Sequence, residues 1–176
     1  MHSNEQTKSL LEAVTRYAEA LDEASVAYLE GRGISKDVAE QFSLGTVTNP
    51  INGHEQFTGW LSIPYFSAIG RCTSVKFRRT DEGKPKYGQP LGQKLHIYNV
   101  SDILSDSGHI AICEGELDAV VMSGLCDIPA VGIPGVAAWK PFYSKLFNGF
   151  DKIFILGDND VKEDGTNPGA EFSRRV

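Results

Sequence analysis

The stretches IAICEGELD (residues 110–118) and IFILGDND (residues 153–160) share one construction, an apolar run of strand length that ends directly in carboxylates. An uninterrupted apolar run of this length is typical of a strand buried on both faces, as in parallel sheets. Ligands bind at the carboxyl ends of such strands. The two stretches therefore predict a parallel sheet with an acidic ligand-binding edge.

The sequence around these stretches predicts alternating strands and helices, the order of an α/β fold. The last helix has a clear start signal, because Asn167 can cap it and Pro168 suits its first position. From residue 101 onward we expect strand 110–113, helix 116–124, strand 129–133, helix 137–147, strand 153–156 and helix 168–176.

The residues before position 101 predict a different order of elements, with helices first and strands after them. Apolar spacing predicts helices at 5–23 and 25–30, and a third that begins at a Ser35 cap and is closed by Gly45. Strands are expected at 60–66, 71–79 and 95–98, with a turn at 81–83; Pro64 favours a sheet edge or a strand end. We therefore expect a helical segment 1–45, a mixed α+β subdomain 46–104 and a parallel-sheet domain 105–176.

Composition narrows the class of protein. The 176 residues have the apolar and charged fractions of a globular protein, with no apolar run long enough for a membrane span and no secretory signal at the N-terminus. The three cysteines lack C-x-x-C spacing, which argues against a zinc ribbon or a disulfide framework and favours a reducing cytoplasm.

Charge is segregated along the chain, although its net value is −6. Such a basic stretch can be an ordinary solvated strand face or a surface for nucleic-acid phosphates. Between residues 71 and 94 two acidic residues, Asp81 and Glu82, accompany seven basic ones: Arg71, Lys76, Arg78, Arg79, Lys84, Lys86 and Lys94.

The acidic stretches have the spacing of a metal site. Asp118 lies one helical turn after Glu114, and Asp158 and Asp160 lie on one side of an extended segment. Neighbouring carboxylates repel each other unless a cation holds them, and Mg²⁺ prefers oxygen ligands while keeping positions for phosphate. Either pattern alone could be a solvated turn. Together they predict a Mg²⁺ site made by Glu114, Asp118, Asp158 and Asp160, and no Gly-rich phosphate loop accompanies it.

These residues also carry a family resemblance. Glu114-Gly115-x-x-Asp118, followed by Asp158-x-Asp160, resembles the Toprim domain shared by bacterial-type primases, topoisomerases and some nucleases. The segment Tyr28-Leu29-x-x-Arg32-Gly33 resembles the opening of the RNA-polymerase domain of DnaG-like primases, and Pro85-Lys86-Tyr87 resembles its basic stretch.

The resemblance implies a Toprim-like (Rossmann-like) α/β sheet with flanking helices after a small α+β basic subdomain. It further implies a primase that makes short RNA primers on single-stranded DNA from ribonucleoside triphosphates, with two or more Mg²⁺ or Mn²⁺ ions. Glu114, Asp158 and Asp160 would be catalytic. The residues that it assigns to nucleic-acid or nucleotide binding are Arg71, Lys76, Arg78, Arg79, Lys86 and Lys94.

The implied setting is the cytoplasm of a bacterial or phage-infected cell, with a replicative helicase as partner. A zinc-binding or C-terminal primase module is expected on another chain, because the family's zinc module and last Toprim strand have no counterpart here. Relative to the family's usual spacing after Asp158-x-Asp160, residues 161–168 are an insertion. We therefore expect weak or no activity alone. Two alternatives are a Toprim nuclease or topoisomerase fragment, and a non-catalytic DNA-binding subunit of a split primase.

Overall fold

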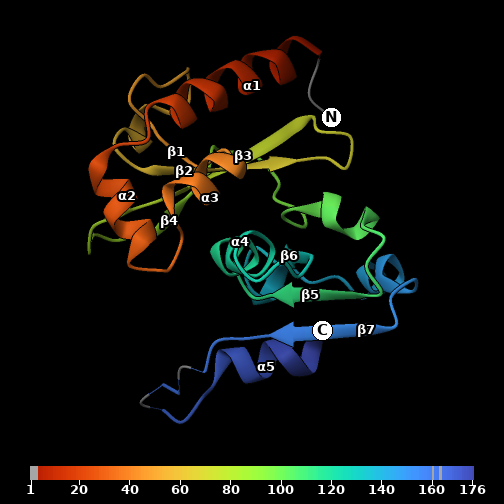
Figure 1. The fold of residues 1–176 in the computed structure, drawn as a ribbon. Coiled ribbons are helices and arrows are strands. Elements are labelled where there is room, and N and C mark those ends of the chain that lie inside the picture. Colours follow the sequence, from red (N-terminus) through yellow and green to blue (C-terminus); the bar gives the residue numbers. More distant parts are fainter. Residues whose placement is uncertain (1–3, 160, 163) are drawn as a thin grey trace. The chain divides into compact units, whose positions relative to one another are not determined.

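The computed structural model describes residues 4–159, 161–162 and 164–176. The chain forms two compact units, one up to Leu95 and one from His96 onward. Their elements are drawn in Figure 1. Within the described part of the chain, no helix is long and apolar enough to cross a membrane.

The first unit combines three helices with a small antiparallel sheet. Its long helix lies against the sheet, and apolar residues of both make the core, among them Val14, Tyr17, Val75 and Phe77. A short 3-10 helix, η1 (Glu55–Phe57), precedes the second strand. The helices are α1 (Asn4–Glu19), α2 (Glu23–Glu30) and α3 (Lys36–Gln41), and the strand order is β1 (Gly45–Thr46), β2 (Leu61–Phe66), β3 (Cys72–Arg78) and β4 (Tyr87–Gly88).

Capping explains how the helices differ from the prediction. The first helix is shorter than expected, because Asp22 caps the second one by accepting a hydrogen bond from Ser25 N at 2.8 Å. Ser35 caps α3 as predicted. Gly45 does not close α3, so that expectation was wrong: Ser43 takes the left-handed conformation (φ 54°) instead. Gly45 lies in β1, where a Cβ atom would overlap the backbone of α1.

Two features of the sheet depart from regular strand pairing, one at a proline and one at a glutamine side chain. Pro64 lies in an inner strand rather than at a sheet edge, but β1 pairs only with Leu61 and Ser62, so Pro64 faces no partner on that side. Opposite it in β3, Val75 forms hydrogen bonds with the side-chain amide of Gln93. The strand expected at 95–98 does not form; Tyr98 alone makes an isolated bridge to Gly132.

The second unit confirms the predicted α/β fold with a parallel sheet and flanking helices. Its hydrophobic core includes Ile110, Ile112, Val131 and Phe172. Asn167 caps the last helix as expected, accepting a hydrogen bond from Ala170 N at 3.0 Å. The elements are η2 (Val100–Leu104), β5 (His109–Cys113), α4 (Glu116–Gly124), β6 (Ala130–Gly132), β7 (Lys152–Leu156) and α5 (Pro168–Arg175), with strand order β6-β5-β7.

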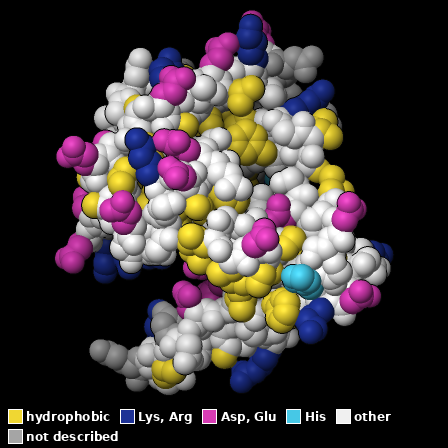
Figure 2. Space-filling model, in the orientation of Figure 1, with side chains coloured by type: hydrophobic (Ala, Val, Ile, Leu, Met, Phe, Trp, Pro, Cys, Tyr) yellow, Lys and Arg dark blue, Asp and Glu magenta, His cyan; other side chains and the backbone are white. Residues whose placement is uncertain are grey.

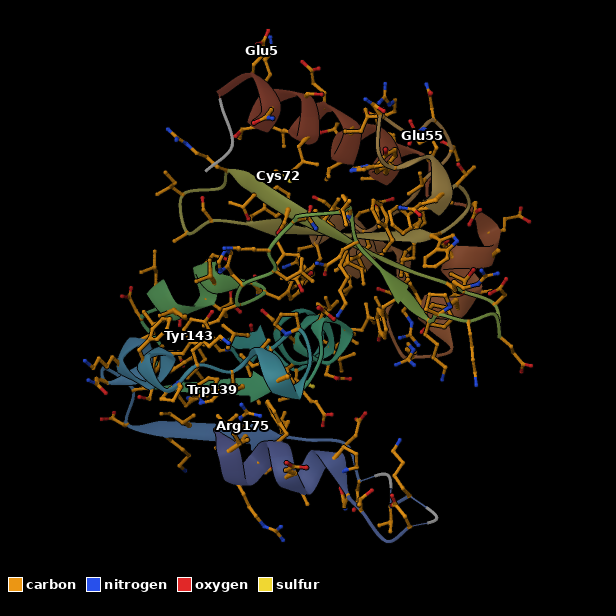
Figure 3. All side chains as sticks on the ribbon, turned by 180° about the vertical axis from the view of Figure 1, so that it is seen from behind. Glu5, Glu55, Cys72, Trp139, Tyr143 and Arg175 are labelled. Carbon is orange, nitrogen blue, oxygen red and sulfur yellow. The ribbon has the colours of Figure 1, made fainter. Side chains whose placement is uncertain are left out.

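The helix expected at 137–147 was wrong. Two 3-10 segments, η3 (Val136–Ala138) and η4 (Pro141–Phe147), take its place. Pro141 lacks an N–H group and keeps the preceding Lys140 extended, so an α-helix cannot run through this point. Trp139 and Tyr143, labelled in Figure 3, still pack edge to face, with ring centroids 5.8 Å apart.

Strand β7 was predicted to be buried, and this was also wrong. It lies at the edge of the sheet among the described strands, and its residues from Ile153 to Leu156 are 37–42 % exposed. Figure 2 shows apolar side chains at the surface of this unit. A parallel strand usually has neighbours on both sides, and an apolar edge invites pairing.

Candidate active site

Glu114 and Asp158 lie side by side at the carboxyl ends of β5 and β7. The two strands are paired in parallel with Cys113 opposite Leu156, so both chains leave the sheet at the same edge. The Glu114 N–H donates to the Leu156 carbonyl, and a Glu114 carboxylate oxygen accepts a hydrogen bond from Asp158 N, each at 3.0 Å. The backbone of one strand end thus orients the carboxylate of the other.

Asp118 lies close to the same strand end. It belongs to the first turn of α4, whose N-terminal flank is Gly115, and a Cβ atom on Gly115 would lie 2.9 Å from an Asp118 carboxylate oxygen. Burial, together with the negative charge of Asp118, raises the pKa of the nearby Cys113 thiol to about 12. Cys113 therefore stays protonated, and the chemistry available at this edge is that of carboxylate oxygens.

Two glycines let the last helix approach Asp158. A Cβ atom on Gly169 would lie 2.5 Å from the Asp158 nitrogen and 2.6 Å from its carbonyl carbon, and one on Gly157 would lie 3.0 Å from the Gly169 carbonyl carbon. The Asn167 amide also donates to Asn159 Oδ1 at 3.0 Å. Sequence reasoning missed this role of the glycines, for which the signal was a glycine immediately before Asp158.

The oxygen ligands suit a hard divalent cation. Asp158 is exposed and has no ion pair with a described lysine or arginine. Among the described residues, no group of three or more His, Cys, Asp or Glu side chains is arranged to hold a metal ion. Asp160, the fourth predicted ligand, lies outside the described residues.

The basic residues belong to the first unit, and two of them lie on tyrosine rings. Arg78, at the end of β3, is only 7 % exposed. Its guanidinium lies 5.1 Å from the centre of the Tyr28 ring and 4.5 Å from that of Tyr87. The Lys76 ammonium lies 4.4 Å from the centre of the Tyr87 ring. The sequence motifs contained both tyrosines, but their contacts with these cations were not foreseen.

Arg79 has a different environment from Arg78. Its guanidinium binds both carboxylate oxygens of Asp81, at 2.6 and 2.7 Å, and lies 5.2 Å from the centre of the Trp60 ring. The hydrogen bonds from Arg79 and from Gly83 N lower the pKa of Asp81 to about 2. This arginine therefore closes the predicted turn. The other predicted nucleic-acid contacts are exposed side chains: Arg71, Lys86 and Lys94.

Comparison with known proteins shows a sequence relative and several solved structures with a similar fold. The Gene 57 protein of Mycobacterium phage D29 is 39 % identical over 124 residues, which are 68 % of this chain and 77 % of that protein. No family model matches the sequence. The fold is similar to the Aquifex aeolicus primase structure with zinc-binding and RNA polymerase domains (TM-score 0.75, 19 % identity, 98 % of this chain and 51 % of that one).

A second solved structure, the DnaG primase catalytic domain bound to single-stranded DNA, is similar with a TM-score of 0.65 and 17 % identity. The match covers 92 % of this chain and 64 % of that one. The chain thus spans between about half and two thirds of the length of these primase structures.

Proposed function

This chain belongs to the family of the Gene 57 protein of Mycobacterium phage D29, and because its fold is that of DnaG-type primase catalytic cores, we propose that it is the catalytic portion of a DNA primase. It would make short RNA primers on single-stranded DNA from ribonucleoside triphosphates. The observation that carries this proposal is the hydrogen-bonded pair Glu114–Asp158 at the carboxyl edge of the sheet.

The acidic edge would hold two or more Mg²⁺ or Mn²⁺ ions through Glu114, Asp118, Asp158 and Asp160. When bound, such ions neutralise and align the triphosphate of the incoming nucleotide. The carboxylate of Glu114 is held by the Asp158 N–H, so it can keep a fixed direction toward the reacting groups. It would act there as a general base or as a metal ligand.

The basic residues would bind phosphates of the template or nucleotide. The contacts proposed for this role are those of Arg71, Lys76, Arg78, Arg79, Lys86 and Lys94. Phosphate contacts release counterions, so template binding should weaken steeply as salt rises. In the related DnaG structure the catalytic domain is bound to single-stranded DNA, which supports the same class of template here.

The exposed edge of β7 supports a further part of the proposal. An apolar strand from the rest of a primase catalytic core would pair with this edge and cover Ile153 to Leu156. A zinc-binding module and a replicative helicase would complete the assembly. The isolated chain is therefore expected to be weakly active or inactive.

The decisive experiment measures primer synthesis. The chain is incubated with single-stranded template, ribonucleoside triphosphates and Mg²⁺ or Mn²⁺, with and without the C-terminal part of a primase. Asp158→Asn and Asp160→Asn should abolish short RNA products, whereas the control Asp106→Asn, at an exposed aspartate of the same unit, should not. Undiminished synthesis by Asp158→Asn would refute the assignment of the site. DNA binding without synthesis under every condition would favour a non-catalytic subunit.

A further inference from the structure

We propose that Asn167 is a positioning residue of the acidic edge, because its side-chain amide caps α5 and at the same time holds Asn159. Asn159 is the middle residue of the stretch Asp158-x-Asp160. The inference rests on the proposed function for one point, the divalent cation that the carboxylates would hold. It assigns a role to two uncharged residues that do not belong to the predicted set of acids.

One amide group makes both contacts. Asn167 Oδ1 accepts a hydrogen bond from Ala170 N at 3.0 Å, which caps the helix, and Asn167 Nδ2 donates to Asn159 Oδ1 at 3.0 Å. Asparagine is among the best capping residues, and it also carries an NH₂ donor, which an aspartate cap lacks. The two contacts together fix the plane of the amide, so Asn159 is held in a defined place relative to the first turn of α5.

The turn that joins Asn159 to Asn167 forms through bonds of its own. Lys162 N donates to the Thr166 carbonyl at 2.8 Å. Asp164 Oδ1 accepts hydrogen bonds from the N–H and the hydroxyl of Thr166, at 2.9 and 2.6 Å. Figure 1 shows this turn beyond the end of β7, before α5 returns along the strand. The turn therefore does not depend on the bond between the asparagines, and what that bond orders is the segment that leaves β7.

A backbone contact restrains the same segment. A Cβ atom on Gly169 would lie 2.5 Å from the Asp158 nitrogen, so the first turn of α5 touches the backbone of Asp158 directly. The next residue, Asn159, is held by the cap. Two consecutive residues after β7 are thus fixed on one helix start, which limits the directions open to the Asp158 carboxylate.

The acidic edge gains from such a restraint. Asp158 is exposed, forms no ion pair with a described lysine or arginine, and has its N–H bonded to the Glu114 carboxylate at 3.0 Å. Neighbouring carboxylates repel each other until a cation binds. Loss of the hydrogen bonds that orient metal ligands typically costs roughly 10- to 100-fold in metal affinity. Asn167 would supply that support through Asn159, without touching the cation.

The first test needs no metal. Asn167→Ser keeps a capping oxygen but loses the amide donor. Thermal unfolding should therefore be unchanged, while the Asp158 amide should exchange its hydrogen roughly fivefold faster. Thr166→Val, which removes only the hydroxyl bond to Asp164, is the matched control and should leave the Asp158 amide at the parent rate. An unchanged exchange rate in Asn167→Ser would overturn the proposal.

A double-mutant cycle and a rescue show whether Asn167 acts through Asn159. Asn159→Ala should speed the exchange as much as Asn167→Ser, and the two together should add nothing. Asn167→Asp should keep the parent rate, because the Asn159 amide can turn and donate to the second carboxylate oxygen. Combined with Asn159→Asp it should lose that rate, since two carboxylates would then face each other. Additive effects of Asn159→Ala and Asn167→Ser would overturn the proposal.

Mn²⁺ binding connects the contact with the proposed chemistry. In isothermal titration of the full chain, Asn167→Ser should bind Mn²⁺ roughly tenfold more weakly than the parent, and Thr166→Val should bind it equally well. Equal affinity of the parent and Asn167→Ser would overturn the role at the metal site. A parent that binds no Mn²⁺ would instead refute the metal assignment of the proposed function, and the exchange of the Asp158 amide would still decide whether Asn167 positions this segment.

Discussion

Gly169→Ala gives a sharp test of how α5 supports the acidic edge, because two physical effects predict opposite signs. Alanine is the better helix former by about 1 kcal/mol, so propensity alone predicts stabilisation. Its Cβ atom, however, would lie 2.5 Å from the Asp158 nitrogen, where ordinary contacts begin at 3.4 Å. The atoms that the Cβ atom would meet belong to the backbone of Asp158, so no flexible side chain can move away to relieve the contact.

The clash should dominate. The start of α5 and the backbone of Asp158 would have to separate by at least about 1 Å, and overpacking of this kind costs roughly 1–3 kcal/mol. After the helix gain is subtracted, we expect a net loss of up to about 2 kcal/mol in the free energy of unfolding. The same shift would lengthen the 3.0 Å hydrogen bond from Asp158 N to Glu114 beyond bonding range.

Urea denaturation followed by circular dichroism measures the stability change, and hydrogen exchange at the Asp158 amide measures the lost bond. The matched control is Ala170→Gly at the adjacent half-buried position, which should cost about 1 kcal/mol through propensity alone and leave the Asp158 amide protected. A Gly169→Ala variant that is more stable than the parent, with an unchanged Asp158 amide, would refute the reasoning.

Two further predictions concern pH. The pKa of the Asp81 carboxyl, measured by NMR, should be near 2, because hydrogen bonds from Arg79 and Gly83 N lower it from 3.8. The stability that this turn contributes is then fully present above pH 3.8 and is lost as the pH falls through 2. A titration midpoint near 3.8 would disprove the contact. Burial lowers the pKa of His54 below 6.5, so the folded state binds fewer protons than the unfolded one and the free energy of unfolding should fall as pH drops below 6.5. His54→Gln should flatten that decline in urea denaturation, and an equal decline in both proteins would contradict the assignment.

Local signals were sufficient for much of the fold. The apolar run 110–113 and the caps Ser35 and Asn167 act within a few residues, and the structure has a strand or helix start at each of them. The helix expected at 137–147 was wrong for a reason that is also local, because Pro141 is visible in the sequence and an α-helix cannot run through it. The exposure of β7 could not be predicted, because a strand's place in a sheet depends on which other strands pair with it.

The acidic edge followed from topology alone. Strands that run parallel end at one edge, so acids placed directly after two such strands must approach each other once the strands pair. This rule needs no knowledge of side-chain contacts, and Glu114 and Asp158 are neighbours in the structure. The close approach of α5 to Asp158 could not be predicted, because Gly157 and Gly169 lie far apart in the sequence and meet only in the folded chain.

The basic segment shows where a count of charges fails. Arg78 and Arg79 are adjacent and chemically identical, but alternation along an extended chain turns them to opposite sides. One side brings Arg78 to Tyr28, fifty residues away in the sequence, and the other leaves Arg79 to the local carboxylate of Asp81. The two adjacent arginines therefore have different partners, although a count of charges treats them alike.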